Sequence, residues 1–236
     1  PWATFSTRIW KKFWHQTGQN LFTRDFLTER QQKNCAAAAA MPAASAERNT
    51  MENLIRQIEN YVPFNEQEIR DKAQILAFLR SGSDLLTREN SVAHLTASAW
   101  VVSPDRSQVV MVYHNLYRSW SWMGGHADGD ADLLRVAKKE VMEECGLQAL
   151  TVVSPEIFSL EVLCVDGHEK KGKYLSSHLH LNVTYLFEAD PAQALRIKPD
   201  ENSGVGWVRV EDIPNKSTES WFCERIYSKL CQKANS

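Results

Sequence analysis

The chain has 236 residues, of which 43% are hydrophobic and 24% are charged, and its formal net charge is -2. This composition predicts a globular domain large enough to bury a core without disulfide support. The slightly acidic balance argues against a nucleic-acid coat and against a polybasic membrane anchor, so we expect neither nucleic acid nor a membrane as a partner. An anionic ligand would then need a local cation.

Five cysteines stand at irregular spacings, and the sequence contains no Cys-x-x-Cys pair. This pattern argues against a disulfide framework and against a cysteine-based zinc site, and a reducing compartment is the default. No apolar run reaches the ~18 residues of a membrane-spanning helix. We therefore expect a cytoplasmic protein.

The first fifty residues differ in composition from the rest of the chain. They are aromatic and basic up to Lys33, and a run of alanines occupies positions 36–40. The segment lacks a clean apolar signal-peptide core. We expect residues 1–50 to be a disordered or non-native extension, with a natural start at Met51. Residues 51–236 are expected to form one domain with an N-terminal helical addition.

Two helices are predicted at the start of this domain, over residues 51–61 and 65–79, with Pro63 between them. Asn65 followed by Glu68 resembles a capping box, which marks a helix N-terminus. Apolar and β-branched runs then predict strands at residues 95–102, 109–113, 152–165, 180–187 and 206–210. A charged loop is predicted over 166–173, and further helices over 132–145 and 218–231.

Strands and helices alternate without a βαβ repeat. This order predicts an α+β fold in which a mixed β-sheet is sandwiched between helices (α/β/α), with the extra helices at the N-terminus.

The predicted helix over 132–145 ends in a cluster of acidic residues. Glu140, Glu143 and Glu144 lie at i, i+3 and i+4, on one side of the helix. Their mutual repulsion and the negative end of the helix dipole both oppose this arrangement. A divalent cation would turn these repulsions into attraction, and oxygen-only ligands suit Mg²⁺ or Mn²⁺.

Glycines precede this helix. Gly124 and Gly125 allow the backbone to approach a ligand closely or to offer a carbonyl oxygen to a metal, and Gly129 permits a tight bend. A strand, a glycine loop and a helix with an acidic end together predict a site for phosphate and metal.

The whole segment resembles the Nudix box. Gly125 matches its first glycine, Glu140 matches the glutamate after arginine, and Glu143 and Glu144 match the glutamate pair. The closing Gly146-Leu147 follows at the family spacing with no insertion. The resemblance extends over roughly residues 95–213 and implies the Nudix fold, with a mixed sheet between helices.

Two positions depart from the box. Ala131 stands where the family has its first glutamate, and Lys139 stands where it has arginine. In the family these two resemble an ion pair that orients the catalytic helix. Asp132 and Lys139 lie two helical turns apart, so we expect their side chains to replace that pair in part. Lysine lacks the planar fork of arginine, so such a contact is less directional.

The resemblance implies Mg²⁺-dependent hydrolysis of a nucleoside diphosphate linked to another moiety, a small-molecule substrate. It implies Glu140 and Glu144 as metal ligands together with a backbone carbonyl of Gly124 or Gly125. Glu143 is implied as a further ligand or as the general base, and Glu201 as a loop carboxylate with a similar role.

Three histidines are candidates for binding substrate. His126 follows the glycines, and His178 and His180 share one face of a predicted strand. Neither of the latter two has a neighbouring pattern that indicates zinc. Two alternatives remain open: a nucleotide-binding Nudix module without catalysis, and a Nudix enzyme acting on a non-nucleotide diphosphate. Dimers are frequent in the family, so a homodimer is a further expectation.

Overall fold

The computed structural model describes residues 50–236 except residue 171. The expectation for residues 1–50 therefore lies outside the described part of the chain for all but residue 50. A helix covers residues 50–60 and is followed by α2 (Glu66–Arg80). Asn65 caps α2 by accepting the backbone N–H of Glu68 at 3.0 Å, as expected. The Glu68 carboxylate does not close the box on Asn65, since it accepts the backbone N–H of Phe64 instead, at 2.7 Å.

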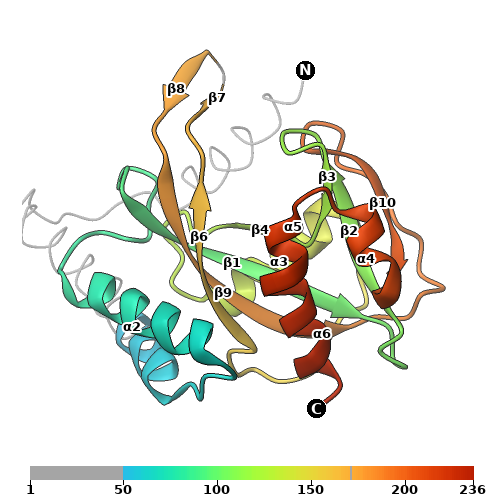
Figure 1. Cartoon of the computed structure of the whole chain (residues 1–236), viewed down its shortest axis with the longest axis horizontal. Coiled ribbons are helices and arrows are strands. Elements are labelled where there is room, and N and C mark those ends of the chain that lie inside the picture. Colours follow the sequence, from blue (N-terminus) through green and yellow to red (C-terminus); the bar gives the residue numbers. More distant parts are fainter. Residues whose placement is uncertain (1–49, 171) are drawn as a thin grey trace, which may run out of the picture. The chain divides into compact units, whose positions relative to one another are not determined.

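One mixed sheet forms the centre of the molecule (Figure 1). Its main strand order is β10-β2-β1-β9-β5, with β3 beside β2, β4 beside β1 and β6 beside β9. β1 and β9 run parallel, and the other pairs of this sheet are antiparallel. The strands are β1 (Ala93–Val102), β2 (Gln108–His114), β3 (Ser119–Ser121), β4 (Met123–His126), β5 (Thr151–Val152), β6 (Ser159–Val165), β9 (His178–Glu188) and β10 (Asn202–Arg209).

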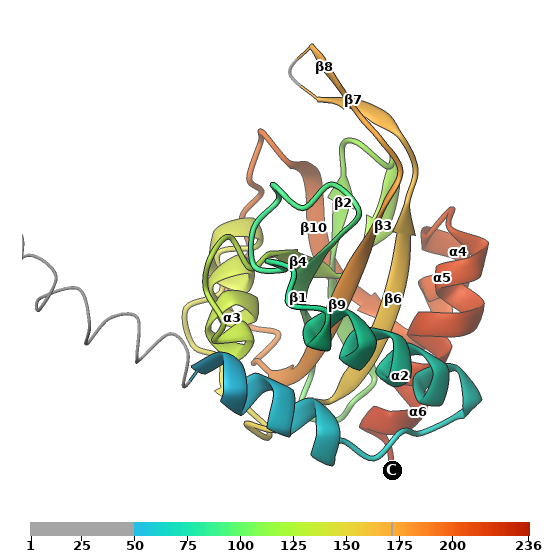
Figure 2. The same ribbon diagram turned by 90° about the vertical axis from the view of Figure 1, so that its left-hand side faces the viewer.

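Helices cover both faces of this sheet. Figure 2 shows α3 (Leu133–Glu144) on one side and the C-terminal helices on the other, with α2 and the helix over 50–60 side by side below. The C-terminal part comprises a 3₁₀ turn (Val210–Asp212), α4 (Ile213–Lys216), α5 (Ser220–Phe222), a π-helical turn (Cys223–Tyr227) and α6 (Ser228–Ala234). The expected α/β/α arrangement with extra N-terminal helices is confirmed. Among the described residues, no helix is long and apolar enough to cross a membrane.

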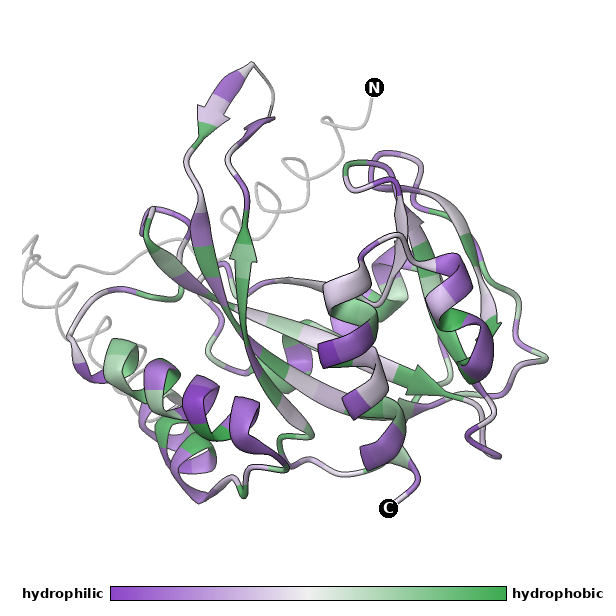
Figure 3. Ribbon diagram, in the orientation of Figure 1, coloured by the Kyte–Doolittle hydropathy of each residue, from purple (hydrophilic) through white to green (hydrophobic). Residues whose placement is uncertain are grey.

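Strand alternation divides the core into two parts. Leu95, Ala97 and Ala99 of β1 pack on the face that carries α3, whereas Trp100 and Val102 pack with the C-terminal helices. In Figure 3, the ribbon of α2 carries both hydrophilic and hydrophobic residues, and Ile75 and Leu76 are among those buried.

A buried polar network crosses the second face. Lys229 of α6 is 3% exposed and donates to Glu161 of β6 at 2.9 Å, and it also lies 3.1 Å from Glu68. Asn182 of β9 donates to the other oxygen of Glu161 at 2.9 Å and accepts from Ser98 of β1, also at 2.9 Å. The C-terminal helix is thus joined to the strand that supports the glycines.

Several expected elements differ from the structure. The single strand expected over 152–165 is interrupted between β5 and β6, where Pro155 has no N–H to donate to a ladder. The charged loop expected over 166–173 is a hairpin, β7 (His168–Lys170) and β8 (Lys173–Leu175), because Gly172 takes a φ of +73° at its turn. The strand expected over 206–210 starts earlier, at Asn202, because its first half pairs with β2. The helix expected over 218–231 begins at Ser220 and contains the π-helical turn.

The glycines also lie in a strand and not in a loop. Gly124 and Gly125 belong to β4 and pair with Ser98 and Ala97 of β1. A side chain at Gly124 would meet Ser98 Oγ at 2.5 Å and the carbonyl oxygen of Ala97 at 2.7 Å. Glycine is required at this position because the backbones of β1 and β4 approach closely. The local sequence does not predict this approach.

Candidate functional site

Helix α3 carries three of the predicted acidic residues and packs beside β4. Asp132 caps its N-terminus by accepting the N–H of Arg135 at 3.1 Å, and Gly146, with a φ of +78°, ends it. Glu144 is buried at 4% exposure and Glu140 is half-buried, whereas Glu143 is exposed. Glu140 and Glu144 therefore face the sheet more than Glu143 does.

Glu144 is held under the glycine strand. Its Oε1 accepts the backbone N–H of Gly124 at 3.0 Å. Burial raises the pKa of Glu144 to about 8, and the charges of Glu140 and Glu201 act in the same direction, while the Gly124 N–H opposes them. Without a bound cation, this carboxylate is therefore held in an environment that disfavours its charge.

Glu140 lies against the other glycine. A side chain at Gly125 would overlap the Glu140 carboxylate. Because glycine has no side chain, the Glu140 carboxylate can lie against β4. Burial raises the pKa of Glu140, and the nearby charge of Glu143 raises it further. Glu140 and Glu144 thus lie at adjacent residues of β4.

Glu201 comes from a distant part of the sequence to the same place. Lys198 Nζ lies 2.9 Å from Glu201 Oε2 and 3.6 Å from Glu143 Oε2, so one ammonium group bridges these two carboxylates. The four predicted acids therefore meet at the end of α3. Lys198 was not predicted, because it lies in an irregular segment and no local pattern marks it.

An arginine stands at the edge of this acidic cluster. Arg88 forms a bidentate pair with Asp128, at 2.7 and 2.6 Å, and the charges of Glu140 and Glu201 also act on it. Asp128 and Gly129 have φ values of +46° and +94°, which confirms the tight bend expected before α3. Arg88 was also missed by sequence reasoning, since nothing near it in the chain marks it.

The expected contact between Asp132 and Lys139 is not formed. Asp132 caps the helix, and Lys139 lies 3.6 Å from Glu143, four residues further along the same helix. Arg135 instead pairs with Asp130 at 2.7 Å. Two helical turns separate Asp132 from Lys139, and each contacts a nearer group, the backbone N–H of Arg135 for Asp132 and the Glu143 carboxylate for Lys139.

The three predicted histidines lie together, with a fourth beside them. His126 ends β4, His178 and His180 begin β9, and His94 of β1 stands between them. His94 and His180 are partners in the parallel β1–β9 pair. His94 was missed because strand pairing, and not the local sequence, brings it to the other three.

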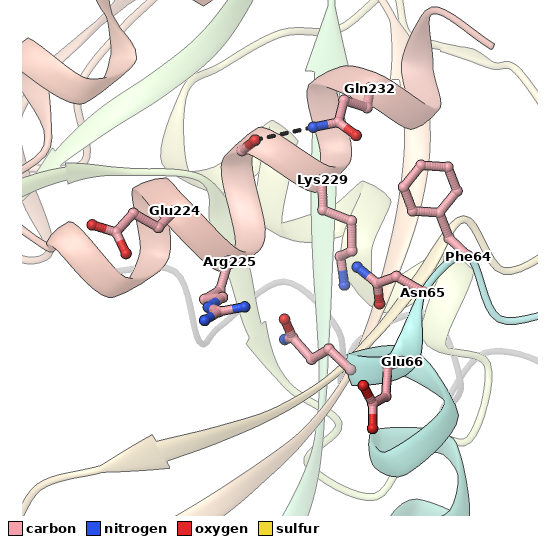
Figure 4. A pocket seen from close by; sticks show the side chains of 9 residues that line it. Phe64, Asn65, Glu66, Glu224, Arg225, Lys229 and Gln232 are labelled. Atoms are coloured by element: carbon pink, nitrogen blue, oxygen red, sulfur yellow. Dashed lines mark hydrogen bonds between the residues drawn. The ribbon is translucent and has the colours of Figure 1, made fainter.

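The cavity in Figure 4 lies elsewhere. It has a volume of about 220 Å³ and lies between the start of α2 and the C-terminal helices. Asn65, Glu66, Arg225 and Gln232 are among its lining residues. It contains none of the predicted site residues and is not part of the acidic cluster.

A model of the NUDIX domain matches residues 92–229. The chain belongs to the Nudix family. The expected enzyme class, a Nudix hydrolase acting on pyrophosphate bonds, follows from this membership. The matched range includes all four acids and all four clustered histidines.

Solved structures with a similar fold include an Ap4A hydrolase from C. elegans, with 17% identity, a TM-score of 0.43, and coverage of 60% of this chain and 94% of that one. A MutT Nudix hydrolase from Burkholderia pseudomallei has 18% identity, a TM-score of 0.39, and coverage of 60% and 97%. The E. coli dihydroneopterin triphosphate pyrophosphohydrolase has 12% identity, a TM-score of 0.45, and coverage of 60% and 96%. No curated protein matches the chain.

Proposed function

We propose that this Nudix enzyme hydrolyses a nucleoside diphosphate linked to another moiety, with Mg²⁺ as its cofactor and Mn²⁺ as a substitute. One observation carries the proposal: Glu140, Glu143, Glu144 and Glu201 gather around the end of one helix, with Lys198 as the cation that bridges two of them. Repulsion between the carboxylates destabilises such a cluster unless a cation of higher charge than the Lys198 ammonium group binds there.

The donor set suits magnesium. Glu140 and Glu144 are the proposed ligands, with Gly124 or Gly125 offering a carbonyl oxygen, because hard oxygen donors are what this ion prefers. The buried Glu144 carboxylate, whose pKa is raised to about 8, gains most from a nearby cation. A bound Mg²⁺ would supply charge neutralisation on the phosphate oxygens and lower the pKa of a water molecule.

The other side chains have separate roles in this proposal. Glu143 or Glu201 accepts the proton of the attacking water, since both carboxylates are partly exposed at the edge of the cluster. Lys198 and Arg88 attract the anionic substrate, because each carries a positive charge beside the acids. Gly124 is exposed, so its backbone is accessible to a phosphate group.

A substrate panel tests the proposal. Purified protein is incubated with nucleoside diphosphates linked to sugars, nucleosides or alcohols, and with non-nucleotide diphosphates, in the presence of Mg²⁺, Mn²⁺ or a chelator. Release of a nucleoside monophosphate or phosphate is measured, with Glu144→Gln protein as the control. Release that requires the metal and Glu144 supports the proposal.

Two outcomes would contradict it. Cleavage of only the non-nucleotide diphosphates would establish the alternative substrate class, and nucleotide binding without any cleavage would establish a binding module. The partner that we propose is a small-molecule diphosphate substrate. We also propose that the protein forms a homodimer. Light scattering of the full chain tests this by measuring the molecular mass in solution.

A further inference from the structure

A triangle of imidazole rings lies at one end of the central sheet. The ring centroids of His94 and His126 are 4.9 Å apart, those of His94 and His180 are 5.0 Å apart, and those of His126 and His180 are 4.8 Å apart. One ring nitrogen from each of these three residues lies within 4.8 Å of the other two. None of these three histidines belongs to the cluster of glutamates at the end of α3.

Three strands hold the triangle in place. His94 of β1 faces His180 of β9 directly in the parallel pair, and His126 of β4 pairs with Thr96, two residues after His94 on the same face of β1. Ligands fixed on paired strands keep their geometry better than ligands on loops. The three rings are therefore brought together by the backbone of the fold.

His94 has the kind of hydrogen bond that commonly orients a metal-binding histidine. His94 Nδ1 lies 3.1 Å from the carbonyl oxygen of Asn90, so it must donate a hydrogen there, and this leaves a lone pair on Nε2. The Nε2 atoms of His94 and His180 are both buried without a hydrogen-bond partner. A backbone carbonyl that fixes the far nitrogen of an imidazole is the usual support of a metal-binding histidine.

These rings are suited to a cation and not to an anion. The ring centroids lie 4.8 to 5.0 Å apart, so protonated rings at this spacing would repel one another. Neutral imidazoles offer lone pairs, which bind metals, whereas binding of a phosphate would need protonated rings in a crowded group. The buried, unpartnered nitrogens thus favour a metal ligand set.

We propose that His94, His126 and His180 together bind one divalent transition-metal ion of the zinc class, distinct from the Mg²⁺ of the acidic cluster. Imidazole donors suit zinc and its neighbours, whereas Mg²⁺ prefers oxygen. In a tetrahedral zinc site the ligand nitrogens lie roughly 3.3 Å apart, so small side-chain rotations close this triangle around an ion. Three ligands leave one position for water or for a phosphate oxygen. The proposal does not depend on the proposed function.

His178 stands beside the triangle, with its ring centroid 4.9 Å from that of His94 and 5.1 Å from that of His180. Its Nδ1 lies 2.8 Å from the carbonyl oxygen of Ser176 and donates to it. It is not part of the three-nitrogen group, so its removal is expected to have a smaller effect than removal of a triangle member.

The test is a titration of tag-free, full-length protein with Zn²⁺ and with Co²⁺, in excess Mg²⁺ so that the acidic cluster is occupied. One equivalent of Zn²⁺ is expected to bind, and Co²⁺ is expected to give a visible absorption band. His94→Phe, His126→Phe and His180→Phe should each weaken binding by roughly 100-fold or more. His114→Ala removes a histidine on β2 outside the cluster and should leave binding unchanged.

Glu144→Gln separates this proposal from the proposed function, since the variant should lose turnover and still bind Zn²⁺. Zinc X-ray absorption of the wild-type protein covers the case in which the phenylalanine variants do not fold. A shell of three imidazole nitrogens supports the proposal, and a shell of oxygens only overturns it. Zinc binding that survives all three substitutions also overturns it.

Discussion

The side-chain amide of Asn202 donates to the backbone carbonyl of Glu144 at 3.0 Å, and this contact ties the start of β10 to the last turn of α3. The Oδ1 atom of the same side chain accepts the backbone N–H of Lys198 at 3.1 Å. Because Glu201 precedes Asn202 directly, one buried amide places Glu201 and Lys198 beside the acids of the helix.

Replacing this amide tests its role. Asn202→Ala leaves a buried carbonyl and a partly buried N–H without these partners, so we expect a loss of about 1–3 kcal/mol in the free energy of unfolding. Turnover should also fall, because Glu201 and Lys198 lose their anchor. Urea unfolding and initial rates measure the two effects. Asn60→Ala, at an exposed position of the first helix, should change neither quantity.

The two glutamates of the pair should matter for chemistry more than for folding. Glu143→Gln and Glu144→Gln keep the shape of the side chain, and a glutamine oxygen at position 144 can still accept the N–H of Gly124. We expect turnover to fall roughly 100-fold or more in each variant, as when one group that stabilises charge is removed. The melting temperature should stay near that of the wild type. Steady-state kinetics measure the loss, and Glu224→Gln, an exposed glutamate outside the cluster, is the matched control. Full activity in both variants would remove these residues from the mechanism.

The stability of the metal-free protein should depend on pH through Glu144. Its pKa rises from 4.5 to about 8 on folding, mainly through burial, so between these values the folded state binds more protons than the unfolded state. Stability should therefore fall as the pH rises from about 5 to 8. Glu68 acts in a separate window, since burial opposes its charge but Lys229 lowers its pKa to about 2, and its contribution is lost only as the pH falls below 4.5.

Calorimetry across this pH range measures the effect. Added Mg²⁺ should reduce the decline, because a cation favours the charged form of Glu144, and Glu144→Gln should remove most of it. A melting temperature that rises steadily from pH 5 to 8 without metal would contradict this account.

Gly124→Ala should damage the protein through a backbone clash. The new Cβ would meet the carbonyl oxygen of Ala97 at 2.7 Å, and a carbonyl in a paired strand cannot move aside cheaply. We expect a loss of about 1–3 kcal/mol in unfolding free energy, typical of overpacking. Gly206→Ala is the control, since its nearest neighbour lies 4.0 Å from the added carbon. Equal melting temperatures for the two variants would show that β4 shifts without cost.

Lys229→Met should destabilise the fold strongly. The ammonium group lies 2.9 Å from Glu161 and 3.1 Å from Glu68, and both carboxylates are fully buried. Loss of the lysine leaves two buried carboxylates with less positive charge beside them. We expect the free energy of unfolding to fall by about 3–5 kcal/mol. Lys138→Met, at an exposed position on α3, should have little effect. Equilibrium unfolding of the two variants tests the difference.

The sequence by itself determined the features that depend on local spacing. Glu140, Glu143 and Glu144 share one side of a helix because of its 3.6-residue period, and Asp132 and Gly146 mark its ends by their capping chemistry. The family and the fold class follow from the same segment, because a long pattern of fixed spacings leaves few alternatives.

The tertiary structure decided which distant residues join that segment. Lys198, Arg88 and His94 were not predicted, and Glu201 was placed by resemblance alone, because each reaches its partners through strand pairing or through contacts between distant segments. β1 meets β9 across more than eighty residues of chain, and only this parallel pair sets His94 beside His180. Local sequence patterns carry periodicity and capping, whereas the meeting of distant side chains depends on how the sheet buries its faces.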